Sequence, residues 1–349
     1  VEATSKAKSL TSFYAVAVGY GYSDAEANTQ VTGNSRLSAL GGELSLTATT
    51  NNVVQVQADS AATNKPIAAT WAQSDVYGET RVSTGDAVVM KANEINLATT
   101  TNLDITTQAT ATERGASSAA MAVAMNNLET ITETLLGGQA DVTGKLNITA
   151  NHDVEQNITN ASATSNGSTS SFSTRLNNSI AGLQRDAATA VLGQFTSKGA
   201  GISAFLFPGI RSGKLNVGAT LAMADTDNTV RAAIQPGAKV TVVGDSVDVQ
   251  AKLADDFNLG AVTLAKSDGV GLGGAVAIGD FNNVVEAFIG DGASLDADGL
   301  LTIRADTELA YPWQVDWSSL EDVLNHLTGG LNNILFTNFA FNDSKGSKL

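Results

Sequence analysis

The chain has 349 residues and a net charge of −15, and this acidic balance makes nucleic acid and anionic membrane surfaces poor partners because both attract basic side chains. It contains no cysteine, which excludes disulfides, thiolate metal sites and thiol nucleophiles. The hydrophobic fraction of 43% is too high for a disordered chain, the aromatic fraction is only 5%, and no apolar run reaches the ~20 residues of a membrane-spanning helix.

One short alternating pattern returns about every fifty residues along the chain. It reads Leu-Ser-Leu-Thr-Ala at 44–48 and recurs at 95–99, 146–150, 247–251 and 301–305. Its central apolar residues are Leu46, Leu97, Ile148, Val249 and Ile303. A period of this size built from strands is typical of an elongated repeat architecture rather than of a compact enzyme fold.

Each repeat divides into several predicted strands and corners. In the repeat before 247–251, an Ala-rich strand at 220–223 precedes a polar corner at 227–229, and a second strand follows at 230–234. A Gly turn then leads to a third strand at 237–242. Counting strands in this way gives about six per period, which predicts roughly two turns of a three-faced coil of about 25 residues each.

Two segments lack this alternating strand pattern, and their apolar spacing predicts helices. The first holds Leu176, Ile180, Leu183, Ala187 and Val191, which recur at the three- and four-residue spacing of an amphipathic helix. The second begins with a capping box at Ser318 and Glu321 and keeps helical spacing to about Phe341, with Gly329-Gly330 dividing it.

These patterns predict an all-β solenoid with helical insertions. We expect solenoid repeats at 1–164, an irregular or helical insertion at 165–214, further solenoid repeats at 215–317, and an amphipathic helical segment at 318–349 that leads to a further repeat. The end of the chain at 346–349 resembles 212–215, where a strand resumes after the insertion. We therefore expect the chain to be a fragment of a longer protein.

Neither histidine fits a catalytic constellation. His152 lies beside Asp153 at a strand end and is expected on the surface, His326 lies on the polar flank of the second predicted helix, and no Gly-x-Ser-x-Gly elbow occurs. We assign no catalytic, cofactor-binding or metal-binding residues.

Paired carboxylates are the main argument for an enzyme. The pairs are Asp225/Asp227, Asp255/Asp256, Asp296/Asp298 and Glu321/Asp322. Most lie at predicted corners, where aspartate is favoured because it bonds its own backbone. Because glycoside hydrolysis uses carboxylate pairs, a polysaccharide-active β-helix enzyme is the alternative.

Three further features have a structural and a functional interpretation. The acidic, Gly-rich segment 291–299 lacks the twelfth-position Glu of a calcium loop. We therefore expect a plain strand with Asp296 and Asp298 outward. The alternative is a spacer that is stiffened by calcium. Gly271-Leu-Gly-Gly lacks the Lys-Ser/Thr of a phosphate loop, so we expect close packing at a turn there. Trp313 and Trp317 are expected to join the second helix to the solenoid end, with sugar contact as the alternative.

Taken together, the strand at 15–18, the corner at 227–229, the turn and strand at 237–242 and the pattern at 301–305 resemble repeats of very large bacterial surface proteins. These are the filamentous-haemagglutinin-like and leukotoxin-type adhesins. The resemblance covers most of the chain outside the two helical segments, and it implies a right-handed parallel β-helix on the bacterial cell surface, with roles in attachment, aggregation, filaments or biofilm matrix. It carries no catalytic residues.

The resemblance and the absence of catalytic motifs together favour a non-enzymatic structural or adhesive segment that is extracellular. Its expected partners are copies of itself, neighbouring repeats of the same chain, surface glycans or cell-surface proteins. No cofactor is expected.

Overall fold

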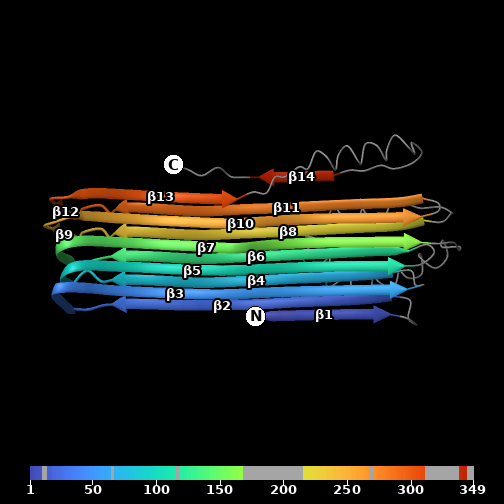
Figure 1. Cartoon of the computed structure of the whole chain (residues 1–349), viewed down its shortest axis with the longest axis horizontal. Helices are drawn as coiled ribbons and strands as arrows, with labels where there is room; N and C mark the ends of the chain where they lie inside the picture. The colour runs from blue at the N-terminus through green and yellow to red at the C-terminus, as the bar shows by residue number, and fades with distance from the viewer. Residues whose placement is uncertain are drawn as a thin grey trace.

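The structure is a computed structural model that describes residues 1–9, 14–63, 67–114, 118–167, 215–267, 270–310 and 338–343. These residues form an all-β parallel β-helix, or β-solenoid, whose strands are stacked in two sheets (Figure 1). All pairings among the described strands are parallel. The predicted fold class is therefore confirmed.

Sheet A and sheet B take alternate strands of the chain. Sheet A has the order β1-β3-β5-β7-β10-β13, with β9 pairing with β7 and β12. Its strands are β1 (Glu2–Ser9), β3 (Arg36–Thr63), β5 (Val89–Arg114), β7 (Gln139–Gly167), β9 (Lys239–Val242), β10 (Ser246–Ser267), β12 (Ser294–Ala297) and β13 (Leu300–Ala310). Sheet B contains β2 (Tyr14–Val31), β4 (Ile67–Thr84), β6 (Ala119–Leu136), β8 (Leu215–Ile234), β11 (Val270–Ile289) and β14 (Asn338–Asp343).

One coil of the solenoid consists of one sheet B strand, a turn and one sheet A strand. Asn102 pairs in register with Asn51 in the coil below, 51 residues earlier. The prediction of two short turns per period is therefore wrong, because one period is a single coil. Val247 pairs directly with Leu146, so the near-double sequence separation at this point is also one step of the stack.

The predicted polar corners are not corners. Residues 227–229 lie inside β8, and the equivalent residues 27–29 and 282–283 lie inside β2 and β11. Asn228 points into the interior, where it accepts a hydrogen bond from Thr130 at 2.5 Å and donates one to Asn283 at 3.0 Å. Because interior partners satisfy this side chain, the strand continues straight through it.

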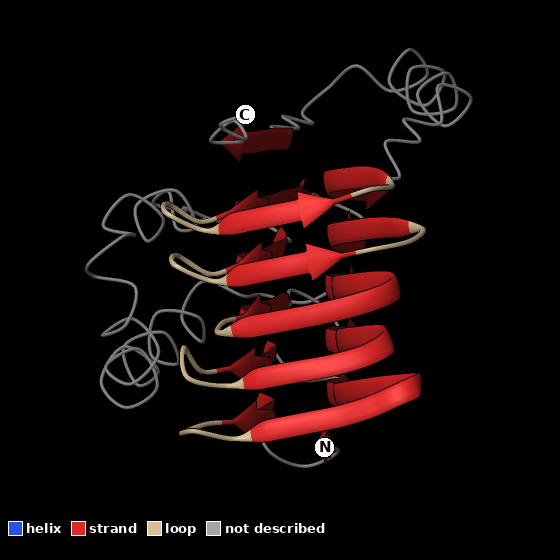
Figure 2. Ribbon diagram, turned by 90° about the vertical axis from the view of Figure 1, so that its left-hand side faces the viewer, coloured by secondary structure: helices blue, strands red, loops and turns tan. Residues whose placement is uncertain are grey.

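The turns within the described residues lie at one end of the sheets, which we call the turn end. Gly138, Gly237 and Gly292 have positive φ angles of 75°, 76° and 69°, which glycine adopts without the strain of other residues. The strands predicted after two of these glycines are confirmed as β9 and β12. Figure 2 looks onto this end, where β9, β12 and the first residues of β3, β5 and β7 form a short third side of the coil.

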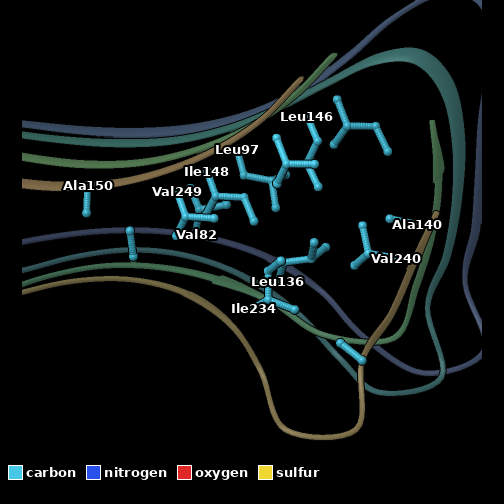
Figure 3. Packing of buried hydrophobic residues seen from close by; sticks show 14 of the residues in the cluster. Val82, Leu97, Leu136, Ala140, Leu146, Ile148, Ala150, Ile234, Val240 and Val249 are labelled. Atoms are coloured by element: carbon cyan, nitrogen blue, oxygen red, sulfur yellow. The ribbon is translucent and has the colours of Figure 1, made fainter. Parts of the chain in front are cut away.

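Apolar side chains fill the interior in two clusters. The turn-end cluster stacks Leu97, Ile148 and Val249 from sheet A against Leu136 and Ile234 from sheet B (Figure 3). The second cluster lies toward the opposite end and is built mainly from small side chains; it includes Ala58, Ala72, Ala109, Ala122 and Leu128. Alanine and valine at most of these positions let the two sheets approach closely.

A buried polar chain crosses the interior from sheet to sheet. Thr80 donates to Thr50 at 2.8 Å, Thr101 bonds Thr80 and Thr132 at 2.8 Å each, and Thr132 lies 3.1 Å from Nδ1 of His152. These five residues come from β3, β4, β5, β6 and β7. Each hydrogen bond therefore links one sheet to the other, which fixes the register between the sheets as well as within them.

The two predicted helices lie largely outside the described residues. Strand β7 continues through Gly167 and β8 begins at Leu215, so only the edges of the predicted insertion are described. In the second segment, β14 pairs in parallel with residues 275–280 of β11. The helical pattern that we extended to Phe341 is wrong there, because 338–343 is a strand on the next level of sheet B. Among the described residues, no helix is long and apolar enough to cross a membrane.

Candidate functional site

The structure does not bring His152 into a catalytic arrangement. Its side chain is 1% exposed, so the expectation of a surface histidine is wrong. Its ring nitrogen Nδ1 lies within hydrogen-bond distance of Thr132, and burial lowers the pKa of His152 from 6.5 to about 4. A neutral histidine at the end of a threonine chain is a structural group. His326 lies outside the described residues.

The predicted carboxylate pairs are also kept apart or turned to solvent. Asp255 is buried whereas Asp256 is exposed, because neighbouring residues of a strand face opposite sides. Asp225 and Asp227 are both exposed on the outer face of β8.

The remaining predicted features are strand residues or are not described. Asp296 points outward, while Leu295 and Ala297 pack on the turn-end cluster, as predicted. Gly271 lies inside β11, so the turn expected at this segment is wrong. Glu321, Asp322, Trp313 and Trp317 lie outside the described residues. Within the described ranges, no group of three or more histidine, aspartate or glutamate side chains is placed to hold a metal ion.

Aromatic side chains gather on the outer face of the first two sheet B strands. The chain has five tyrosines and three tryptophans, and four of the tyrosines and one tryptophan lie on β2 and β4. We call this surface the aromatic face: Tyr14, Tyr20 and Tyr22 on β2, with Trp71 and Tyr77 on β4. The three β2 tyrosines are 56%, 54% and 51% exposed. In a chain so poor in aromatic residues, this concentration at solvent-facing positions points to a binding surface.

Strand register brings two rings of the aromatic face side by side, those of Tyr22 and Tyr77. Strands β2 and β4 are neighbours in the stack (Figure 1), and Val18 pairs with Trp71 while Asp24 pairs with Tyr77. The ring centroids of Tyr22 and Tyr77 are 5.7 Å apart, with the planes inclined at 43°. The two coils thus present one continuous surface rather than separate side chains.

A hydrogen-bond network holds the polar edges of the rings. The Tyr20 hydroxyl donates to Asp75 at 2.8 Å, and the Gln73 amide donates to both oxygens of the same carboxylate at 3.1 and 3.2 Å. The hydrogen bond to Asp75 raises the pKa of Tyr20 above its ordinary value. Asn127 donates to the Tyr77 hydroxyl at 3.2 Å from the next coil.

Aliphatic side chains extend the aromatic face along the same strand. Val16 and Val18 lie between Tyr14 and Tyr20 and are 43% and 60% exposed. The inward positions between these residues are Ala15, Ala17, Gly19 and Gly21. A Cβ atom added at Gly21 would lie 2.5 Å from Val56, so glycine lets sheet A pack directly beneath the rings. The face therefore rests on a close-packed backing rather than on a loop.

The charge around the aromatic face is negative. Strands β2 and β4 carry the carboxylates Asp24, Glu26, Asp75 and Glu79, and Arg81 is their one basic residue. The Arg81 guanidinium is 2.9 Å from Glu79 and 2.9 Å from Glu133, so its charge is already paired. A ligand of this face meets acceptor groups and no unpaired cation from these two strands.

An alternating row of charges runs up the outer face of sheet B beside this surface. Glu133 on β6 lies 2.9 Å from Arg81 on β4 and 2.9 Å from Arg231 on β8, and Arg231 in turn lies 2.9 Å from Glu286 on β11. The four residues come from four successive coils. We call this row the charge ladder; it opposes slippage of one coil past another, because a shift would separate opposite charges.

The sequence carries a signal for the aromatic face, although none of the sequence-based expectations used it. Tyr14, Tyr20 and Tyr22 are all separated by even numbers of residues, which places them on one side of a strand. Trp71 and Tyr77 follow about one coil later, so any solenoid with this period stacks them on the same side. The possibility of sugar contact was instead assigned to Trp313 and Trp317.

Comparison with known proteins gives no information about the function of this site. No family model, no curated protein and no solved structure matches the chain.

Proposed function

We propose that this chain is a non-enzymatic structural and adhesive segment of an extracellular bacterial surface protein. The observation that carries the proposal is an exposed aromatic face on a rigid stack of parallel coils. A stack of this kind rises about 4.8 Å per coil and keeps every outward side chain at a fixed place. Its role is to hold the aromatic face in position for attachment.

The construction of the stack supports a load-carrying role. Successive coils are joined by long strands of up to 29 residues, by the charge ladder and by the inter-sheet threonine chain. Each coil contacts the coils next to it, so such a fold extends by adding coils rather than by enlarging a core. The net charge of −15 suits a surface that must stay soluble.

The last coil supports stacking with further coils as part of the same function. Leu301 and Ile303 occupy the columns in which Val247 and Val249 are fully buried, yet both are 43% exposed. Among the described residues, β14 alone continues the stack beyond β11, and it pairs with six residues of it. We propose that a neighbouring repeat or a second copy covers this apolar edge.

Display on a bacterium that does not adhere or aggregate tests the proposal. Cells that display the chain should attach to host-cell monolayers or clump with one another. The double variant Tyr20→Ala/Tyr22→Ala should reduce this effect, because it removes two exposed rings without altering the interior. Displayed, folded chain that changes neither attachment nor clumping would contradict the proposal.

A further inference from the structure

We infer that the aromatic face binds an extended, uncharged carbohydrate chain. This inference rests on the proposed adhesive function and names the class of ligand for its surface. Four properties of the face carry it: the exposed rings, the polar groups between them, the negative charge and the elongated shape.

The exposed rings provide surfaces for the apolar faces of sugar rings. Tyr20 and Tyr22 expose half of their surface on a sheet face. A ligand that covers these rings removes apolar surface from water, which favours binding. A tyrosine contributes a large, stiff contact area and loses little side-chain entropy on binding. Tyr20 and Tyr22 are further held by the hydrogen bonds of their hydroxyls to Asp75 and Asp24 at 2.8 and 3.5 Å, which lowers the ordering cost.

The polar groups between the rings match the hydroxyl groups of a sugar. Asp24 and Asp75 offer carboxylate oxygens that accept hydrogen bonds from ligand hydroxyls, and Asp75 has its place fixed by Gln73 and Tyr20. Asn127 adds an amide next to the Tyr77 hydroxyl. A face made only of rings and valines would suit a protein or a lipid, whereas alternation of rings with acceptors suits a polyhydroxylated ligand.

The charge of the face selects against acidic glycans. Asp24, Glu26, Asp75 and Glu79 lie on the two strands that carry the rings, and Arg81 is neutralised by Glu79 and Glu133. Sulfated or sialylated chains would meet like charge here. Neutral sugars avoid this repulsion.

The shape of the face favours a chain over a single sugar. Tyr14, Tyr20 and Tyr22 are spread along one straight strand, and nine residues of a strand extend about 30 Å. Val16 and Val18 fill the space between the rings. Because the exposed rings and valines are spread along the strand, one sugar unit would cover only part of them, and affinity must accumulate over several units.

Isothermal titration with defined hexasaccharides tests this inference on the full chain. Cellohexaose and the hexamer of N-acetylglucosamine are the neutral probes, and a heparin hexasaccharide is the acidic probe. At least one neutral probe should bind, with the heparin probe at least about tenfold weaker because of charge repulsion. Tyr20→Ala/Tyr22→Ala should weaken neutral binding by about tenfold or more, as expected for the loss of two stacked rings.

Two further variants separate loss of binding from loss of folding. Tyr20→Phe/Tyr22→Phe keeps both rings and should retain more of the affinity than the alanine pair. Val262→Ala/Leu264→Ala removes two side chains that are 63% and 58% exposed on β10 of the opposite sheet, and it should leave binding unchanged. All variants should unfold at the same temperature as the parent chain.

Several outcomes would overturn the inference. These are neutral probes that do not bind, binding that is unaffected by Tyr20→Ala/Tyr22→Ala, and binding confined to heparin. Sedimentation that shows a dimer which Tyr20→Ala/Tyr22→Ala dissolves would assign the face to a second copy instead. Attachment of displaying cells without neutral-sugar binding would remove the ligand class and leave the adhesive function standing.

Discussion

Individual polar residues in the interior of the solenoid are satisfied by partners on the opposite sheet, and a few are not. Thr101 bonds two threonines at 2.8 Å each, which offsets the cost of burying all three hydroxyls. Asp255 is 3% exposed, and one of its carboxylate oxygens has no hydrogen-bond partner. Burial raises the pKa of Asp255 to about 7, against a smaller lowering effect of the neighbouring Asn157 side chain.

Asp255 is therefore expected to make folding stability depend on pH. In the unfolded chain this carboxyl loses its proton near its ordinary value of 3.8, whereas in the folded chain it keeps the proton up to about 7. The free energy of unfolding should fall as pH rises through this window, by an amount on the order of 3 kcal/mol. Asp255→Asn, which cannot ionise, should shrink the fall between pH 4 and 8 measured by urea unfolding.

A matched control lies next to Asp255 in the strand. Asp256→Asn removes a carboxylate from the exposed side of β10 and should leave most of the pH dependence in place, because the Asp256 charge adds less to the raised pKa of Asp255 than burial does. The same slope in the parent chain and in Asp255→Asn would show that the buried carboxyl is not protonated in the folded state. His152 acts in the opposite direction, because its lowered pKa of about 4 costs stability as pH falls below 6.5.

At the scale of the strands, the charge ladder links neighbouring strands of sheet B in addition to their backbone hydrogen bonds. The Glu133 side chain is 8% exposed and lies between two arginines on neighbouring strands. Removing the charge of Glu133 takes one of two carboxylate partners from each of Arg81 and Arg231.

Glu133→Gln is expected to lower the free energy of unfolding by about 1–3 kcal/mol, because the ion pairs are partly buried. The midpoint of urea unfolding at neutral pH measures the loss. Glu308→Gln is the control, since the Lys252–Glu308 pair is longer, at 3.3 Å, and exposed on both sides; it should cost no more than about 0.5 kcal/mol. Equal effects of the two substitutions would show that the ladder is no stronger than a surface ion pair.

Strand periodicity in the sequence was enough to predict the strand class and the stacked columns but not the length of a strand or of a coil. The columns through Leu46, Leu97 and Ile148 are confirmed, because a period of 51 residues is visible in the apolar pattern itself. The division of each period into short strands failed at Asn228 and its equivalents, where a polar residue that usually marks a turn is buried inside a strand. Local sequence does not reveal that an interior partner such as Thr130 is present.

The candidate site was missed for a related reason. Whether Tyr22 contacts Tyr77 depends on the register between β2 and β4, and this register follows from the true coil length. With coils of half that length, the two rings would not have been neighbours. The even spacing of the β2 tyrosines was present in the sequence, but placing them beside the rings of β4 required the correct stacking of the coils.

At the scale of the whole molecule, the solenoid separates two tasks. The interior and the charge ladder hold the coils in register, while the outer face of the first coils is left free to carry exposed rings that the core does not need. The exposed tyrosines of β2 therefore lie where they contribute little to the interior packing, which is the pattern expected when a repeat scaffold presents a binding surface.

A coil of 51 to 53 residues with two long strands is the feature on which the strand register and the aromatic face both depend. The chain contains no cysteine, so a pair of introduced cysteines reports on proximity without interference. Asn51 and Asn102 are in register on adjacent strands, with their side chains 2.7 Å apart, and neighbouring strands lie within the span of a disulfide. Asn51→Cys/Asn102→Cys should form a disulfide efficiently under mild oxidation, and Asn51→Cys/Asp75→Cys, which places the second cysteine on the opposite sheet, should not. Cross-linking of the second pair and not of the first would contradict the proposed coil.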